Sequence, residues 1–352
     1  MSERENLTSM GMAQLEELVS RLGERRFRAT QIHRWVHARG VRSIEEMSNL
    51  SKGFRDELAK HVEIRPTEIE TVQRARDGTR KYALRTSRGD IVESVFIPNA
   101  SAEGRNTLCI SSQVGCAIDC KFCLTASLGL IRNLDGGEIA EQLTRVKEDL
   151  GPDIPVQNIV MMGMGEPLQN YGALVESIGI LTSDHGHKLS PRRITVSTAG
   201  LVSRIPKLGH DTGVNLAVSL NATTDAVRDR IMPINRKWNI EALLDACRRF
   251  PLPERRRITF EYVLLAGIND SLDDARRLVR LLEGFRCKVN LIPFNEHPES
   301  PYRRPDEAVV TAFRETLAKR GLSAFVRTPR GDDISAACGQ LGAEVSRLPV
   351  VS

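Results

Sequence analysis

The chain has 352 residues, of which 41% are hydrophobic and 27% charged, and this composition excludes an extensively disordered protein. Its net charge of +5 at neutral pH permits a nucleic-acid partner without requiring one. The sequence has no run of about 18 apolar residues and no signal-peptide pattern, so we expect a cytoplasmic monomer with no membrane segment.

The first 64 residues are predicted to form a small helical domain. Apolar residues recur at helical spacing in Met12–Leu22 and Ala29–Val36, and Ser43 begins a capping-box pattern. Two interpretations of the many arginines in this segment stay open: a solvated basic face, or a surface that docks RNA. These arginines are Arg25, Arg26, Arg28, Arg34, Arg39 and Arg42.

Residues 65–105 are predicted to form a β-hairpin that connects this domain to the rest of the chain. Glu68–Arg76 and Lys81–Thr86 flank a turn at Asp77-Gly78, and Ile91–Ile97 follows a second turn.

From residue 106 the pattern changes to strands that alternate with amphipathic helices. Short β-branched strands in this arrangement favour a parallel sheet curled into an open barrel. A Rossmann fold is the competitor, but no G-x-G-x-x-G motif follows the first strand. We therefore expect an α/β protein with a partial (β/α)6 barrel over residues 106–300 and a C-terminal segment over 301–352. The six expected strands are Thr107–Ser111, Asn158–Met162, Arg193–Ser197, Val214–Leu220, Thr259–Leu264 and Lys288–Pro293.

Three closely spaced cysteines, Cys116, Cys120 and Cys123, are the strongest chemical signal. Three thiolates on one loop can hold three irons of a cubane cluster and leave the fourth iron open, as a catalytic metal centre requires. The alternative is a zinc site, which needs a fourth ligand. His185 and His187 are the best histidine pair, and their spacing of two is short for a zinc motif.

Polar residues and glycines follow several of the expected strands, at the end of a barrel where ligands bind. Each one alone is most simply a turn or capping residue, but their shared position favours a ligand site. Glu166 can pair with an ammonium group, and the glycines before it let backbone approach a ligand closely. The candidate ligand-binding residues are Gly165, Glu166, Ser197, Ser219, Leu220, Asn221 and Asn295.

The C-x3-C-x2-C motif, with an aromatic residue before its last cysteine, resembles the signature of the radical S-adenosylmethionine (SAM) superfamily. Longer motifs, and nearly the whole chain from Ala29 to Leu341, resemble the RlmN family of dual-specificity adenine-C2 methyltransferases. Asn221 departs from the histidine that many members carry. The motifs are Thr107-Leu-Cys-Ile-Ser-Ser-Gln-Val-Gly-Cys116, Met162-Gly-Met-Gly-Glu-Pro-Leu168, Arg230-Ile-Met-Pro-Ile-Asn235 and Arg330-Gly-Asp-Asp-Ile-Ser-Ala-Ala-Cys-Gly-Gln-Leu341.

The resemblance implies a 4Fe-4S cluster on the three cysteines and two SAM molecules for each turnover. One SAM methylates Cys338, and the radical from the second activates that methyl group for addition to adenine C2. Cys109 then resolves the covalent intermediate through a disulfide with Cys338, and Glu93 accepts a proton. The implied substrates are 23S rRNA, at the adenine usually numbered 2503, and adenine 37 of some tRNAs, with a flavodoxin-type protein as electron donor.

Other interpretations of these residues stay open. A lone cysteine is usually a small buried hydrophobe, which is the simplest reading of Cys247 and Cys287, and pattern alone would give the same reading of Cys109. Competing functions are a Cfr-type enzyme that methylates the same rRNA adenine at C8, and an iron–sulfur RNA-binding protein without catalysis.

Overall fold

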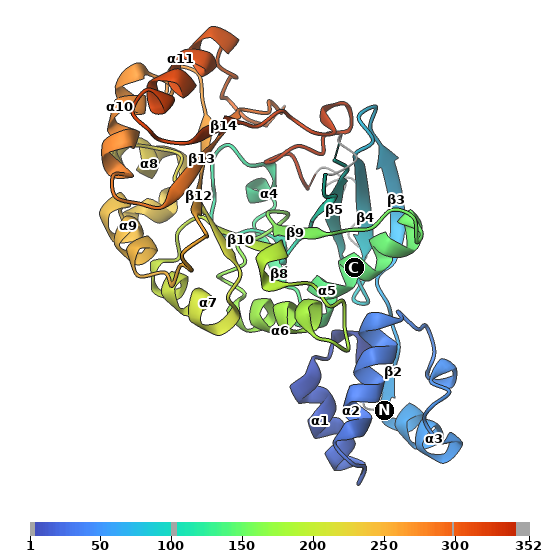
Figure 1. The fold of residues 1–352 in the computed structure, drawn as a ribbon. Helices are drawn as coiled ribbons and strands as arrows, with labels where there is room; N and C mark the ends of the chain where they lie inside the picture. Colours follow the sequence, from blue (N-terminus) through green and yellow to red (C-terminus); the bar gives the residue numbers. More distant parts are fainter. Residues whose placement is uncertain (1–3, 100–103, 298, 343–352) are drawn as a thin grey trace.

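The computed structural model describes residues 4–99, 104–297 and 299–342. Its main feature is one ten-stranded sheet with the order β14-β13-β12-β11-β10-β9-β6-β5-β4-β3. The sheet curves around a central space, and helices line its outer side (Figure 1). In the described part of the chain, no helix has the length and apolar character needed to cross a membrane.

Seven neighbouring strands of this sheet are parallel, which confirms the expected α/β partial barrel. Six of them match the six expected strands. The seventh, β14, was not among the expected strands. The strands are β6 (Thr107–Cys109), β9 (Asn158–Met161), β10 (Ile194–Thr198), β11 (Asn215–Ser219), β12 (Ile258–Leu264), β13 (Cys287–Pro293) and β14 (Ala324–Val326).

Amphipathic helices connect the parallel strands and cover the outer face of the sheet (Figure 1). Their apolar stripes and the sheet's outward side chains form one large core, to which Phe260, Leu243 and Phe313 belong. These helices are α5 (Gly136–Leu150), α6 (Tyr171–Thr182), α7 (Ile205–Thr212), α8 (Asp225–Ile231), α9 (Ile240–Arg248), α10 (Leu272–Leu281) and α11 (Glu307–Ala318).

The predicted hairpin is present, and its strands continue the same sheet. They are β3 (Glu68–Arg74), β4 (Arg80–Arg85) and β5 (Ile91–Ile97), all antiparallel to their neighbours. β5 pairs with β6, so that Val95 lies opposite Cys109. The hairpin thus supports the strand that carries one of the predicted catalytic cysteines.

The N-terminal residues form a helical unit with a hydrophobic core of its own, which includes Leu15, Ile32 and Leu58. The expected capping box at Ser43 is present but begins a single 3-10 turn, and α2 continues as a π-helical turn over Arg34–Ala38. The unit lies below the barrel in Figure 1. Its elements are β1 (Glu5–Asn6), α1 (Met12–Arg21), α2 (Phe27–His33), α3 (Lys52–His61) and β2 (Val62–Glu63).

Three histidines lie where this helical unit meets the barrel. The rings of His33 and His37 are 4.7 Å apart, and both side chains are buried. His37 Nε2 donates to the Met10 carbonyl at 2.7 Å. On the barrel side, His187 lies 3.3 Å from the Thr144 hydroxyl. Burial lowers the pKa of His37 and of His187 to about 3 and also lowers the pKa of His33.

These buried histidines predict that the folded protein loses stability in acid. An unfolded histidine takes up a proton near pH 6.5, whereas folded His37 stays neutral down to about pH 3. Its contribution to stability is therefore complete above about pH 6.5 and decreases as the pH falls toward 3, by on the order of 2 kcal/mol at about pH 5. His37→Gln keeps a donor for Met10 and cannot be protonated. Urea unfolding at about pH 7.5 and 5 should show a smaller acid loss for this variant than for the wild type.

The matched control for this prediction is His210→Gln, because His210 is exposed on α7. This variant should keep the acid loss of the wild type. An identical pH dependence for the His37 variant and the wild type would contradict the assignment.

Candidate active site

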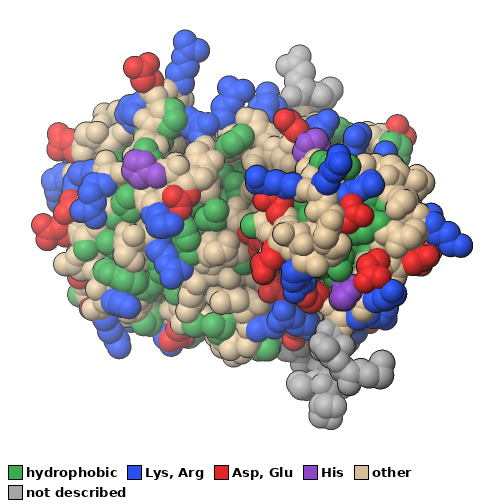
Figure 2. Space-filling model, turned by 90° about the horizontal axis from the view of Figure 1, so that it is seen from below, with side chains coloured by type: hydrophobic (Ala, Val, Ile, Leu, Met, Phe, Trp, Pro, Cys, Tyr) green, Lys and Arg blue, Asp and Glu red, His purple; other side chains and the backbone are tan. Residues whose placement is uncertain are grey.

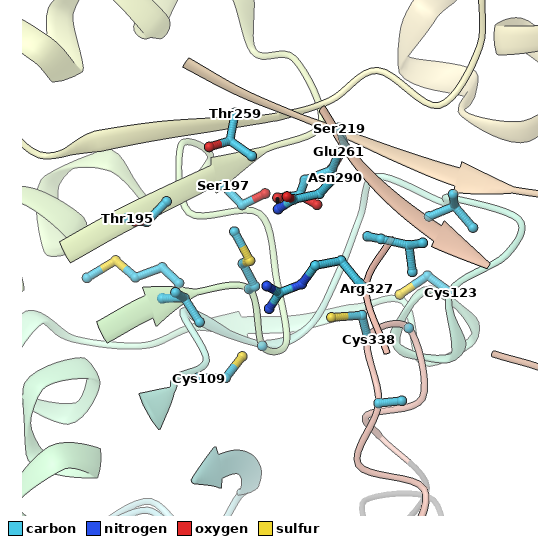
Figure 3. A pocket seen from close by; sticks show the side chains of 18 of the residues that line it. Cys109, Cys123, Thr195, Ser197, Ser219, Thr259, Glu261, Asn290, Arg327 and Cys338 are labelled. Atoms are coloured by element: carbon cyan, nitrogen blue, oxygen red, sulfur yellow. Dashed lines mark hydrogen bonds between the residues drawn. The ribbon is translucent and has the colours of Figure 1, made fainter. Parts of the chain in front are cut away.

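A cavity of about 530 Å³ occupies the inside of the curved sheet. Its walls are the inward side chains of the parallel strands, the cysteine loop after β7 (Gln113–Gly115), and residues 327–339 near the C-terminus. Eleven of the thirteen predicted site residues line it, and Figure 3 shows part of this lining. Glu93 and Leu220 do not line it.

The three clustered cysteines lie together at one end of this cavity. The loop that carries them begins from a hairpin, β7 with β8 (Leu130–Asn133), that the sequence patterns did not reveal. Gly115 makes the close turn possible, because its φ is 74° and a side chain there would meet the Gly129 carbonyl. Cys123 N donates to the Cys120 carbonyl at 3.0 Å, just before the short helix α4 (Leu124–Ser127).

The thiols of this loop fit a cluster of several metal ions. Burial raises the pKa of all three thiols, that of Cys116 to about 12, and the other two sulfurs raise that of Cys120 further. Such thiols become thiolates when a positively charged group replaces their protons. Within the described ranges, no three His, Cys, Asp or Glu side chains are arranged to hold a single metal ion. A cubane cluster instead places each thiolate at a separate corner.

Glu166 lies at the end of β9, in the glycine-rich loop that the sequence predicted. Gly165 has a φ of 99°, and a side chain there would collide with Gln113. Glu166 accepts the N–H groups of Leu168 and Ala199 at 3.0 and 2.7 Å. Burial raises the pKa of Glu166 to about 7 despite these bonds. The carboxyl group is therefore fixed in place at the cavity wall, where it can accept from a bound cation.

The other predicted ligand-binding residues differ in how free their side chains are. Ser197 and Ser219 face the cavity from β10 and β11 (Figure 3). Asn221 also lines it, but its Oδ1 accepts from Val263 N at 2.8 Å, which ties β11 to β12. The side chain of Leu220 is buried in the core, and only its backbone lies near the site. Asn295 Oδ1 is buried, and no residue that the structure describes forms a hydrogen bond to it, so it is available to a ligand.

Cys109 and Cys338 both face the cavity, although 229 positions separate them in the sequence (Figure 3). Cys109 is the last residue of β6 and is buried. Burial raises the pKa of its thiol, and the neighbouring Cys338 sulfur raises that pKa further. Cys338 is accessible from the cavity, although the protein around it still raises its pKa by desolvation. Of the remaining cysteines, Cys247 and Cys287 are buried and do not line the cavity.

The segment that carries Cys338 is attached to the cluster end of the cavity. Asn295 Nδ2 donates to the Cys338 carbonyl at 3.1 Å, and Leu124 N donates to the Gly339 carbonyl at 2.7 Å. Farther along, the Thr125 hydroxyl donates to the Leu341 carbonyl at 2.7 Å. The cysteine loop therefore positions both its own thiols and the backbone beside Cys338.

Glu93, the predicted proton acceptor, lies on β5 behind the cavity wall and is fully buried. Its Oε2 accepts from Gly342 N at 2.6 Å, and its Oε1 lies 3.9 Å from Lys81 Nζ. In this arrangement Glu93 fixes the end of the segment that carries Cys338.

Known proteins resemble the chain over almost its whole length. Residues 5–64 match the Ribosomal RNA large subunit methyltransferase N-terminal domain, and residues 110–281 match the Radical SAM superfamily. The dual-specificity RNA methyltransferase RlmN of Anaeromyxobacter sp. (strain Fw109-5) is 53% identical over 97% of this chain and 91% of its own. That of Geobacter sulfurreducens is 51% identical over 97% of this chain and 93% of its own. The chain belongs to the RlmN family.

A solved structure supports this assignment. The radical SAM methyltransferase from Sphaerobacter thermophilus superimposes with a TM-score of 0.88 at 42% identity, covering 96% of this chain and 99% of the other. Membership of the RlmN family, and so of the radical SAM superfamily, implies a 4Fe-4S cluster and SAM as cofactors.

Several residues in the cavity wall or behind it were not singled out from the sequence. Arg228 is fully buried, and its guanidinium donates to the carbonyls of Ala199, Ser219 and Leu220, at the ends of β10 and β11. Glu261, Asn290 and Arg327 face the cavity from β12, β13 and the residue after β14. The Arg230–Asn235 motif lies beside Arg228 in the sequence and could have drawn attention to it. For Glu261 there was no such signal, because the alternation of side chains along a strand does not distinguish a cavity-facing residue from a solvent-facing one.

Proposed function

We propose that this protein methylates C2 of an adenine in 23S rRNA, at the position usually numbered 2503, and C2 of adenine 37 in some tRNAs. The observation that carries the proposal is the meeting of Cys109 and Cys338 in the cavity that also holds the three cluster cysteines. The named relatives are dual-specificity RNA methyltransferases. We also propose that the protein is a cytoplasmic monomer. A flavodoxin-type protein would be its electron donor.

The proposed binding roles follow from the cavity wall. Cys116, Cys120 and Cys123 would hold the 4Fe-4S cluster, and Glu166, Ser197, Ser219, Asn221 and Asn295 would hold SAM. When bound, the reduced cluster supplies the electron that cleaves SAM to methionine and a 5′-deoxyadenosyl radical. The buried amide oxygen of Asn295 is suited to accept a hydrogen bond from SAM.

Cys338 and Cys109 would share the methyl transfer. The Cys338 thiolate takes a methyl group from one SAM. The radical from a second SAM would remove one hydrogen atom from that methyl group, and the carbon radical so formed would add to adenine C2. Cys109 Sγ then attacks Cys338 Sγ, so that a disulfide forms while the bond between Cys338 sulfur and carbon breaks. The C2 proton leaves, and the unpaired electron that radical addition puts on the base would return to the oxidised cluster. The methylene carbon keeps the electron pair of the broken carbon–sulfur bond and takes up a proton, which gives the 2-methyl product.

Glu93 is the proposed acceptor of the C2 proton. Its carboxylate now accepts from Gly342 N, so this bond has to open before Glu93 reaches the base. Opening it would also release the end of the segment that carries Cys338.

Nucleoside analysis tests the proposed function directly. RNA treated with the cluster-loaded, reduced protein and SAM should yield 2-methyladenosine on digestion and mass spectrometry. Recovery of 8-methyladenosine would instead assign the Cfr-type reaction. Absence of 5′-deoxyadenosine from the reduced protein would indicate an iron–sulfur RNA-binding protein without catalysis.

RNA docking is proposed for the helical N-terminal unit. Figure 2 views this face from below, and basic side chains there are interleaved with acidic ones. Arg26, Arg28 and Arg42 form ion pairs with nearby glutamates. Arg25 and Arg34 are exposed, and no carboxylate among the described residues lies within ion-pair distance of either. These two are therefore the best candidates for phosphate contacts.

The double variant Arg25→Glu/Arg34→Glu should weaken RNA binding and reduce its dependence on salt. Each lost phosphate contact removes about one unit from the slope of log affinity against log salt. Filter binding or fluorescence anisotropy over a salt series measures both quantities. The double variant Arg280→Glu/Arg314→Glu, at exposed positions of α10 and α11, is the matched charge reversal and should bind RNA like the wild type. Equal losses in both variants would point to net charge alone.

A further inference from the structure

Three neighbouring strands place one polar side chain each at the same level of the cavity. Ser219 on β11 is the register partner of Glu261 on β12, and Glu261 is the partner of Asn290 on β13. All three face the cavity (Figure 3). We call Ser219, Glu261 and Asn290 the polar row.

Closer to the cluster cysteines, the cavity wall changes from polar to apolar. Two residues beyond the polar row, β12 and β13 present the apolar side chains of Val263 and Ile292. The end of β13 leads to Phe294, which packs against Phe122 of the cysteine loop. The polar row is therefore separated from the cluster end by a layer of apolar side chains. A SAM molecule held at the cluster end would reach Ser219 at one end of the polar row, which leaves Glu261 and Asn290 to a second ligand.

The polar row offers hydrogen-bond acceptors to a ligand. Asn290 Nδ2 donates to Glu261 Oε1 at 2.9 Å, which commits the amide nitrogen and leaves Asn290 Oδ1 available. No donor among the described residues bonds to Asn290 Oδ1 or to Glu261 Oε2. Glu261 is only 7% exposed, so water cannot solvate it fully. Two acceptors thus lie side by side in a poorly hydrated site.

The surroundings place this acceptor pair close to the reacting sulfurs. Figure 3 shows the Arg327 side chain extending between the polar row and the sulfurs of Cys109 and Cys338. Burial raises the pKa of Glu261, while Asn290 and Arg327 lower it. Burial also raises the pKa of Cys338, and Glu261 raises it further, which agrees with this proximity. Arg327 forms no ion pair with Glu261, so the carboxylate keeps its capacity to bind a ligand.

We propose that Glu261 and Asn290 recognise the exocyclic amino group of the target adenine. The inference rests on the proposed function. An adenine amino group has two N–H donors, which match the two available acceptors. Guanine and hypoxanthine have a carbonyl oxygen at the same position, and that oxygen would face two other acceptors. A buried acceptor pair left unpaired rejects such a base strongly. Glu261 is thus a specificity-determining residue of the site.

The test replaces the target adenosine in the RNA by inosine. Inosine keeps the C2 hydrogen and changes the 6-amino group to a carbonyl, so C2 remains open to methylation. With the wild-type protein, kcat/KM for inosine RNA should be at least about 100-fold below that for adenosine RNA. Purine riboside RNA, which has only hydrogen at position 6, should fall in between.

Glu261→Gln should change this preference. Its amide is isosteric with the carboxyl group but exchanges one acceptor oxygen for a donor nitrogen. We expect kcat/KM for adenosine RNA to fall about 10- to 100-fold, as for a lost hydrogen bond to a charged group. The preference for adenosine over inosine should fall at least about tenfold. Purine riboside RNA, which lacks the amino group, should react with the variant almost as it does with the wild type.

The controls separate a role toward RNA from a role toward SAM or folding. Glu283→Gln makes the same change on an exposed residue just beyond α10 and should match the wild type. Glu261→Gln should retain iron content, SAM binding and S-methylation of Cys338 in the absence of RNA. Loss of SAM binding or S-methylation would assign Glu261 to the SAM ribose and overturn the inference.

The substrate series also distinguishes this inference from the proposed function. A wild-type protein that methylates adenosine and inosine RNA equally well would overturn the base-recognition role while the methyltransferase function stood. A wild-type protein that methylates no RNA adenine at all would refute both. Because the inosine comparison needs no variant, it remains decisive even if Glu261→Gln does not fold.

Discussion

Cys109→Ala should trap the protein on its RNA as a covalent adduct. Once the carbon carried by Cys338 is bonded to adenine, release requires a second sulfur within reach of the Cys338 sulfur. Cys109 faces the same part of the cavity, whereas Cys247 and Cys287 are buried elsewhere. The variant should therefore form the carbon–carbon bond and complete less than one turnover. A denaturing gel, run with and without ribonuclease, shows the adduct as an RNA-dependent shift.

Two further variants separate the roles of the cysteines. Cys338→Ala should give neither product nor adduct, because no sulfur remains to carry the methyl group. Cys247→Ala makes the same change on α9, away from the cavity, and should turn over like the wild type. An adduct with Cys338→Ala, or none with Cys109→Ala, would reverse or refute the assigned roles.

Replacement of any cluster cysteine by alanine should abolish both iron binding and SAM cleavage. The three sulfurs line one end of the cavity, and two cysteines cannot complete the protein's share of a cubane cluster. Iron content, visible absorbance and 5′-deoxyadenosine formation should all fall to background. Cys287→Ala, at the start of β13, is the matched control and should keep all three. A triple variant of Cys116, Cys120 and Cys123 that still cleaved SAM would refute the assignment of the cluster.

The sequence predicted the barrel well because its strands and helices have strong periodic patterns. It also predicted the glycine loop at Glu166, since a strand followed by Gly-x-Gly-Glu determines where the carboxyl group lies. It did not reveal β14 or the β7–β8 hairpin, whose strands are only three or four residues long. The equally short β6 was found because it begins the longer run Thr107–Ser111. Short strands of this kind are defined by their partners across the sheet.

Residues brought together from distant parts of the chain were the hardest to predict. Cys109 and Cys338 are neighbours in the structure but are separated by 229 positions in the sequence, so no local sequence pattern connects them. Glu261 was missed because a strand pattern cannot tell a cavity from solvent: both accept polar side chains. Glu93 was named from the sequence as a proton acceptor. The structure also shows that it accepts a hydrogen bond from Gly342 N, a contact that the sequence did not suggest.

The depth of the cavity has a consequence for the shape of the RNA. Cys109 is only 7% exposed and faces the inside of the curved sheet, where a base stacked within a helix cannot reach it. The target nucleotide has to leave its stack and rotate out of the strand before its base can enter. Unstacking costs a few kcal/mol in a paired helix and less in a loop, a bulge or a strained turn. The local fold of the RNA thus selects which nucleotides can enter the cavity.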